Sequence, residues 1–138
     1  MAQWTYNGQE ITEQPDGVAG FIYLITNKTN NKKYIGQKVF QFKKTKYRKG
    51  KRKQHLLVES DWGTYTGSND ALNADIALLG KDQFTYEIIH MCKTKSEMNY
   101  LETKTIINSD ALIRSDYYND WVKIRVTRRH LSSLQIKN

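Results

Sequence analysis

The sequence predicts an α+β fold in which three strands and two helices follow one another within one domain. Two observations support this prediction. The residues between Gly20 and Asn27 form a short apolar run that is rich in aromatic and β-branched side chains, which favours a buried strand over a helix. Residues 70–79 and 94–107 instead repeat apolar side chains at helical spacing, and each of these stretches begins next to residues that cap helices.

A β-hairpin over residues 21–36 is the first element of this fold. Its loop contains three residues of a type that tolerates a positive φ and hydrogen-bonds to its own backbone: Asn27, Asn30 and Asn31. The returning strand is expected to begin at Tyr34 and to end at Gly36. Residues 1–19 are expected to form a short strand or an irregular arm that docks on the domain.

Two tyrosines of this hairpin are candidates for a shared site. Side chains alternate along a strand, so Tyr23 shares a face with Phe21 and Ile25. Tyr34 lies on the partner strand, within reach of a cross-strand neighbour. Either the two phenol oxygens converge on one site, or both tyrosines pack in the core with their hydroxyls at its rim.

Length and composition indicate one domain in a reducing compartment. A chain of 138 residues is long enough for one modest core, with an arm at 1–19 and the domain at 20–138. No run is long and apolar enough for a membrane span, and the polar residues 1–20 do not have the pattern of a secretory signal. The single cysteine, Cys92, excludes an internal disulfide, fits the cytoplasm and is expected to be a buried apolar side chain.

Positive charge is concentrated in a basic insertion at residues 37–58. The net charge of +8 favours a polyanionic partner, and nucleic acid leads the possible classes. We expect a partly mobile loop that either follows a phosphate backbone or is only a solvated surface. Its basic residues, with no acid among them, are Lys38, Lys43, Lys44, Lys46, Arg48, Lys49, Lys51, Arg52 and Lys53. Those expected to contact DNA are Lys43, Lys44 and Arg52.

A loop and a helix follow the basic insertion. Glycines and short polar residues between Trp62 and Ser68 predict the loop. Ser68 or Asn69 is expected to cap the helix at 70–79, and Gly80 to end it. The backbone amides at the start of this helix could hold a phosphate, in which case Ser68 would contact DNA. Alternatively, Gly67 and Ser68 only shape the loop and cap the helix.

The third strand is predicted at Phe84–Met91, and a second helix follows it. Thr94 and Glu97 have the spacing of a capping box, which places the start of this helix. Glu102 falls within the apolar stripe of the helix. A carboxylate there requires a metal ion, a basic partner or a position at the edge of the stripe.

The order of these residues resembles the GIY-YIG nuclease family. Phe21-Ile22-Tyr23 and Tyr34-Ile35-Gly36 resemble the paired signature of the family, although Phe21 stands where Gly is usual. The residues around Glu102 resemble the metal-binding helix of the family, and Tyr118-Asn119 resembles a motif near the end of the domain. The stretch from Trp62 to Ser68 is similar to a subgroup that is common in bacteriophage genomes. The resemblance implies a small three-stranded antiparallel sheet flanked by helices.

The resemblance also implies a function, which we state as an expectation. The protein would be a DNA endonuclease that depends on Mg²⁺ or Mn²⁺ and acts on double-stranded DNA in the cytoplasm of a bacterial or phage-infected cell. Glu102 would bind the metal, Tyr23 or Tyr34 would orient or deprotonate the attacking water, and Asn119 would contact DNA.

The sequence departs from the family at one expected catalytic position. Members usually carry an Arg on a helix shortly after the second tyrosine triplet, and a Lys-rich segment occupies that place here. Candidates for the catalytic cation are Arg48, then Arg52 and Lys38, with Arg125 next. The missing Arg and the atypical Phe21 leave open a nucleic-acid-binding module that no longer cleaves. A third possibility is a structural or inhibitory protein whose basic face meets an acidic protein.

Overall fold

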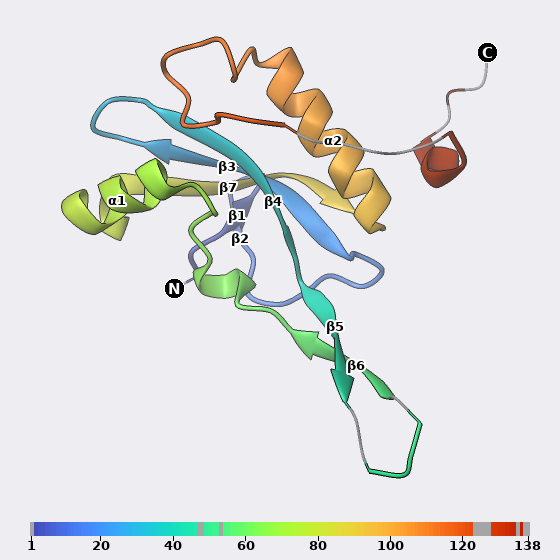
Figure 1. Ribbon diagram of the computed structural model, residues 1–138. Coiled ribbons are helices and arrows are strands. Elements are labelled where there is room, and N and C mark those ends of the chain that lie inside the picture. The colour runs from blue at the N-terminus through green and yellow to red at the C-terminus, as the bar shows by residue number, and fades with distance from the viewer. Residues whose placement is uncertain (1, 47–48, 53, 123–127, 135, 137–138) are drawn as a thin grey trace.

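The computed structural model describes residues 2–46, 49–52, 54–122, 128–134 and 136. In this part of the chain a five-stranded sheet has the order β2-β1-β7-β3-β4, and β5 and β6 form a separate two-stranded sheet (Figure 1). The strands are β1 (Thr5–Tyr6), β2 (Gln9–Glu10), β3 (Gly20–Asn27), β4 (Lys33–Val39), β5 (Gln41–Lys46), β6 (Gln54–Glu59) and β7 (Phe84–Cys92). The two α-helices are α1 (Asp70–Leu79) and α2 (Lys95–Asn108).

The antiparallel centre of the main sheet consists of β7, β3 and β4, the three strands expected from the sequence. The expected size of the sheet is wrong, because β1 pairs with β7 in parallel and β2 pairs with β1, which makes a mixed five-stranded sheet. Trp4 anchors these two short strands. Its fully buried ring lies 5.1 Å from the rings of Phe21 and of Tyr23, measured between centroids.

The two faces of the sheet carry separate apolar clusters. Phe21, Tyr23 and Ile25 point to one face, as the alternation along β3 predicts, and pack with Leu72 and Ile76 of α1. The other face packs against α2, where the buried residues include Ile22, Ile35, Cys92, Met98 and Ile106. The strand between these layers is therefore buried on both faces, which explains its nearly continuous apolar sequence.

Both helices begin at the residues expected to cap them. The Asn69 side chain accepts a hydrogen bond from the Leu72 amide at 2.9 Å, and the Thr94 hydroxyl accepts one from the Glu97 amide at 3.1 Å. Gly80 ends α1 with a φ of 95°, a conformation that few residues other than Gly adopt. Neither helix combines the length and apolar character that crossing a membrane requires.

The basic insertion has more regular structure than the sequence suggested. β4 does not end at Gly36 but continues to Val39, and β5 and β6 then pair in register from Gln41 opposite Glu59 to Lys46 opposite Gln54. The expected loop is therefore largely a β-hairpin. Lys has a low strand propensity and the segment lacks an apolar alternation, so its sequence carried no strand signal.

Candidate active site

Tyr23 crosses the outermost strand of the sheet at a glycine. The register of β3 and β4 places Tyr23 opposite Gly36. A Cβ atom at Gly36 would lie 2.3 Å from the Tyr23 hydroxyl oxygen and 2.4 Å from the ring carbon that bears it. Only the absence of a side chain at this position lets the phenol reach across β4 to the edge of the sheet.

Tyr34 lies beside Tyr23, and a loop closes over the pair. The two ring centroids are 6.1 Å apart, which confirms that the tyrosines are neighbours on one face. The Tyr34 hydroxyl and the Ser68 hydroxyl are 3.3 Å apart. A Cβ at Gly67, whose φ is 89°, would lie 3.4 Å from both tyrosines. The loop before α1 thus fixes the position of the second phenol.

Glu102 approaches the same edge from the opposite face of the sheet. Met98 and Ile106, one turn before and one turn after it, are buried against the sheet, whereas Glu102 itself is half-buried. Its half-buried side chain lies at the edge of the stripe, one of the three environments left open from the sequence. No ion pair joins Glu102 to a basic residue within the described ranges.

These side chains meet in one pocket of about 230 Å³ at the edge of β4. The predicted residues that line it are Tyr23, Tyr34, Ser68, Glu102 and Asn119. Sequence reasoning missed Gln37, Asp120 and Trp121, which also line it. Asp120 and Trp121 directly follow the Tyr118-Asn119 motif, and that proximity was the available signal.

Burial shifts the pKa values of three side chains in the pocket, Tyr23, Tyr34 and Glu102, toward their neutral forms. Burial raises the pKa of Tyr23 well above its ordinary value, and the neighbouring Tyr34, Tyr65 and Glu102 add to this effect. Burial also raises the pKa of Tyr34. Burial raises the pKa of Glu102, while a hydrogen bond from Gln37 and the charge of Lys95 act in the opposite direction. Both tyrosines are therefore neutral phenols in the protein alone.

Asn119 fixes the segment at residues 119–122, which forms one wall of the pocket, to strand β4. Its carboxamide oxygen accepts a hydrogen bond from the Ile35 amide at 3.0 Å, and its nitrogen donates one to the Ile35 carbonyl at 2.8 Å. Tyr118, the preceding residue, is buried, and its hydroxyl donates to Asp75 at 2.6 Å. Because both polar atoms of the Asn119 side chain are already bonded, its observed role is to hold the segment against β4.

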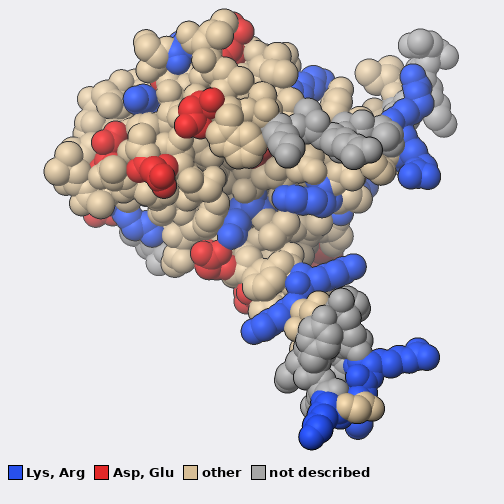
Figure 2. Space-filling view, in the orientation of Figure 1, with Lys and Arg blue, Asp and Glu red and all other residues tan. Residues whose placement is uncertain are grey.

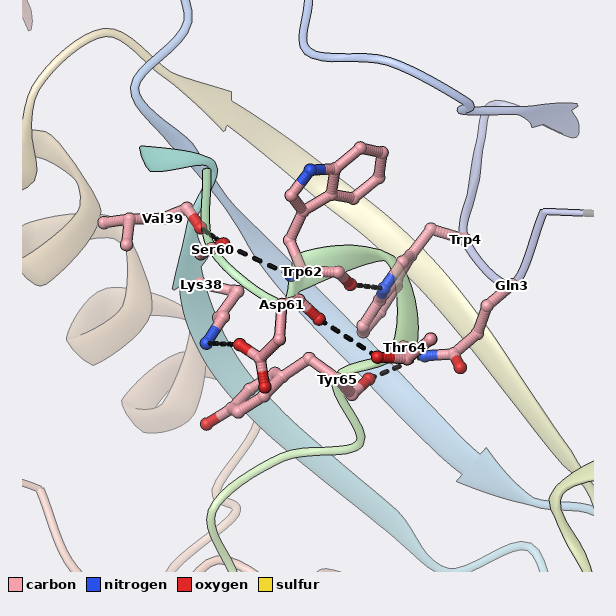
Figure 3. A network of polar contacts seen from close by, with 9 residues as sticks. All are labelled: Gln3, Trp4, Lys38, Val39, Ser60, Asp61, Trp62, Thr64 and Tyr65. Atoms are coloured by element: carbon pink, nitrogen blue, oxygen red, sulfur yellow. Dashed lines mark hydrogen bonds and ion pairs between the residues drawn. The ribbon is translucent and has the colours of Figure 1, made fainter. Parts of the chain in front are cut away.

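The expected cations lie elsewhere or outside the described residues. Lys38 does not line the pocket, because its amine lies 2.6 Å from an Asp61 carboxylate oxygen and 3.9 Å from the centre of the Tyr65 ring. Figure 3 shows this ion pair between the end of β4 and the loop that follows β6. The three residues expected to contact DNA, Lys43, Lys44 and Arg52, are exposed on the projecting β5–β6 hairpin. Blue side chains gather on this hairpin in Figure 2. Arg48 and Arg125 are outside the described residues.

Lys95, the first residue of α2, is a cation near the pocket that the sequence did not reveal. Its amine donates a hydrogen bond of 2.9 Å to the Gln37 side chain, and Gln37 in turn donates one of 2.9 Å to Asn99. Burial of the amine and the charge of Lys38 lower the pKa of Lys95, whereas the charge of Glu102 raises it. The contact joins residues 58 positions apart, so no local motif could have predicted it.

Comparison with known protein families places this chain in one of them. A family model described as "Putative endonuclease segE, GIY-YIG domain" matches residues 4–122. The chain belongs to this GIY-YIG endonuclease family. Its class is therefore that of nucleases, and the substrate class is nucleic acid. Neither the curated proteins nor the solved structures include a significant match.

Proposed function

We propose that this protein is a DNA endonuclease that hydrolyses phosphodiester bonds and depends on a divalent metal ion, Mg²⁺ or Mn²⁺. One observation carries the proposal. Two phenols and one half-buried carboxylate, which come from β3, β4 and α2, converge in a single pocket at the edge of the sheet. The family supports the nuclease class, and the geometry supports these particular residues as its chemical groups.

The donor atoms of the pocket fit a hard divalent cation. Glu102 offers a half-buried carboxylate, and Asp120 offers a second one at the exposed side of the same pocket. Mg²⁺ commonly binds one or two carboxylates and completes its shell with water and phosphate oxygens. We assign Glu102 as the ligand and Asp120 as a second, more exposed donor. When bound there, the ion would act as a Lewis acid on the phosphate and on the departing 3′ oxygen.

The two tyrosines position the attacking water in this proposal. Because burial raises both pKa values, each phenol is neutral, and its oxygen accepts a hydrogen bond from water while its proton remains available to a phosphate oxygen. Tyr34 is half-buried and its hydroxyl is near that of Ser68, so it faces the substrate side of the pocket. Tyr23 is 1% exposed and reaches the pocket only over Gly36, so it defines the inner wall.

A cation is required to stabilise charge that develops on the phosphoryl oxygens. Lys95 is our candidate among the described residues, because its charge acts on Glu102 and its amine is already fixed on β4 through Gln37. Arg48 remains a candidate from the sequence, since a guanidinium engages two phosphate oxygens at once. Lys38 is a weaker candidate, because Asp61 binds its amine.

Incubation of supercoiled plasmid with the purified protein tests the proposal. We expect relaxed or linear products with Mg²⁺ or Mn²⁺ and none with EDTA. Glu102→Gln should abolish cleavage, whereas Glu87→Gln, which alters an exposed carboxylate on β7, should not. Equal cleavage by the Glu102 variant and the parent would show that this carboxylate is not the metal ligand.

A second candidate function is a nucleic-acid-binding module that no longer cleaves. The observation in its favour is that no Lys or Arg lines the pocket among the residues that the structure describes. This candidate predicts that the protein binds DNA but leaves plasmid intact with either metal ion at any protein concentration.

A further inference from the structure

The β5–β6 hairpin is an arm with a rigid root. Phe40, between β4 and β5, is fully buried, and its ring centroid lies 4.9 Å from that of Trp62. The Ser60 amide donates to the Phe40 carbonyl at 2.8 Å. The Ser60 hydroxyl donates to the Val39 carbonyl at 2.6 Å (Figure 3). These contacts lie where both strands leave the domain. The hairpin therefore continues β4, the strand that carries the candidate active site, in a fixed direction.

Beyond this root, the hairpin exposes both of its faces. On one face Phe42 and Lys44 lie beside Leu56, and on the other Lys43 lies opposite Leu57. Phe42 is 46% exposed, Leu56 43% and Leu57 66%. A two-stranded ribbon with no layer packed on it is only marginally stable in water. Apolar side chains on both faces of such a ribbon indicate a surface that another molecule covers.

The charge of the arm selects the kind of partner. Figure 1 shows the hairpin projecting away from the main sheet, and Figure 2 shows its Lys and Arg side chains pointing outward on several sides. The basic residues of the arm whose side chains the structure describes are exposed: Lys43, Lys44, Lys49, Lys51 and Arg52. Cations around the whole ribbon, rather than on one face, fit a polyanion that surrounds it on both sides. A flat acidic surface would contact only one of the two faces.

We infer that the β5–β6 hairpin binds in the major groove of duplex DNA while the pocket at β4 engages a phosphodiester of the same duplex. The choice of DNA as the nucleic acid rests on the proposed function. The major groove, about 12 Å wide, admits a two-stranded β-ribbon, whereas the minor groove, about 6 Å wide, does not. Six-residue strands extend about 20 Å, so the arm spans about six base pairs along the groove. Its lysines then contact the phosphates of both strands, and the apolar side chains on the face turned to the floor of the groove meet the base edges.

Binding in the absence of cleavage tests this inference. Affinity is measured for a short fluorescein-labelled duplex in the presence of EDTA. All proteins compared contain the Glu102→Gln substitution, so that none can cleave the probe. Replacing Lys43, Lys44 and Arg52 together by Gln should reduce the slope of log K against log salt by up to about 2.7, at about 0.9 for each lost contact. It should weaken binding by up to about eightfold per contact at 0.1 M salt. An affinity and slope equal to those of the Glu102→Gln protein would overturn the inference.

A matched control separates the arm from net charge. Three exposed lysines lie outside the arm, on the turn after β3, before β7 and on α2: Lys28, Lys81 and Lys104. Their joint replacement by Gln removes the same charge and should change the salt slope by less than half as much. Thermal unfolding of both triple variants checks that each is folded. Equal losses in the two variants would mean a general charge effect and would also overturn the inference.

The choice of groove has its own measurement. Cytosines that carry a sugar on C5 fill the major groove, and distamycin fills the minor groove of A·T sequences. We expect the protein to bind a duplex with sugar-modified cytosines at least tenfold more weakly than the unmodified duplex. Distamycin should change the affinity by less than a factor of two. The opposite pattern, or equal affinity for a single strand, would contradict the inference. Because these assays need no cleavage, a protein that binds this way but leaves plasmid intact refutes the proposed function and not the arm.

Discussion

Gly36→Ala should slow cleavage, because the new side chain on β4 would displace Tyr23 of the neighbouring strand β3. The added Cβ would lie 2.3 Å from the Tyr23 hydroxyl and 2.4 Å from the adjoining ring carbon, whereas ordinary contact begins at 3.4 Å. The phenol must therefore move by about 1 Å. Its ring packs against Trp4 and Tyr65, with centroids 5.1 and 6.1 Å away, so the core must shift with it. A misplacement of this size costs roughly 10²-fold in rate, which is our expectation for single-turnover cleavage of plasmid.

The same substitution should lower stability by a measurable amount. Overpacking of a well-packed core costs about 1–3 kcal/mol. For 138 residues at about 2.1 cal/mol/K each, this corresponds to a decrease of roughly 3–10 °C in Tm. Gly63→Ala is the matched control, because its Cβ would meet no atom within 4 Å, and it should change neither rate nor Tm. If Gly36→Ala behaves like this control, the Tyr23 phenol either does not lie across β4 or does not take part in cleavage.

Four further predictions concern the pocket. Tyr34→Phe should reduce the cleavage rate at least tenfold while Tm changes little, since only an accessible hydroxyl is lost; an unchanged rate would leave this tyrosine with a packing role. Lys95→Gln should slow single-turnover cleavage more than it weakens DNA binding, because the contact strengthens in the transition state. Burial raises the pKa of Glu102, so a proton competes with the metal ion for this carboxylate at a higher pH than it does at an exposed carboxyl, whose pKa is about 4.3. Mn²⁺ binding, measured by calorimetry, should therefore be lost on acidification before the pH has fallen to about 4.3. Asn119→Leu should lower the free energy of unfolding in urea by about 1–3 kcal/mol, because it leaves the Ile35 amide and carbonyl without their partners.

Local sequence signals predicted the parts of the fold that depend on nearby residues. The apolar run at β3 and the capping residues Asn69 and Thr94 act within a few positions, and the structure confirms each of them. A short strand in residues 1–19 was one of the two alternatives open from the sequence, and β1 and β2 agree with it. Their place in the sheet was not predictable, because two-residue strands show no periodicity and β1 pairs with a strand about 80 residues later. The β5–β6 hairpin was missed because its composition favours solvent rather than a sheet.

The sequence predicted those residues of the candidate site that belong to a recognisable motif. The paired tyrosine triplets and the carboxylate on α2 identified Tyr23, Tyr34 and Glu102, and the pocket brings these three together. Lys95 was not predictable, because its relation to the pocket passes through a hydrogen bond to Gln37 on another element. The effect of burial on the phenols was also missed, since it depends on packing around the tyrosines rather than on their spacing.

The contacts along the outer side of β4 also bear on solubility. A strand at the edge of a sheet presents free amides and carbonyls to which a strand of another molecule can pair, which is a common route to aggregation. Here the Lys33 amide donates to the Asp116 carbonyl and the Lys33 carbonyl accepts from the Tyr118 amide, while the Asn119 carboxamide occupies both groups of Ile35. If β4 carries the active site as proposed, it must stay open to substrate but closed to strands of other copies of the protein. The segment that walls the pocket meets both demands, because it blocks strand addition at residues 33–35 and leaves the half-buried Tyr34 in the pocket accessible.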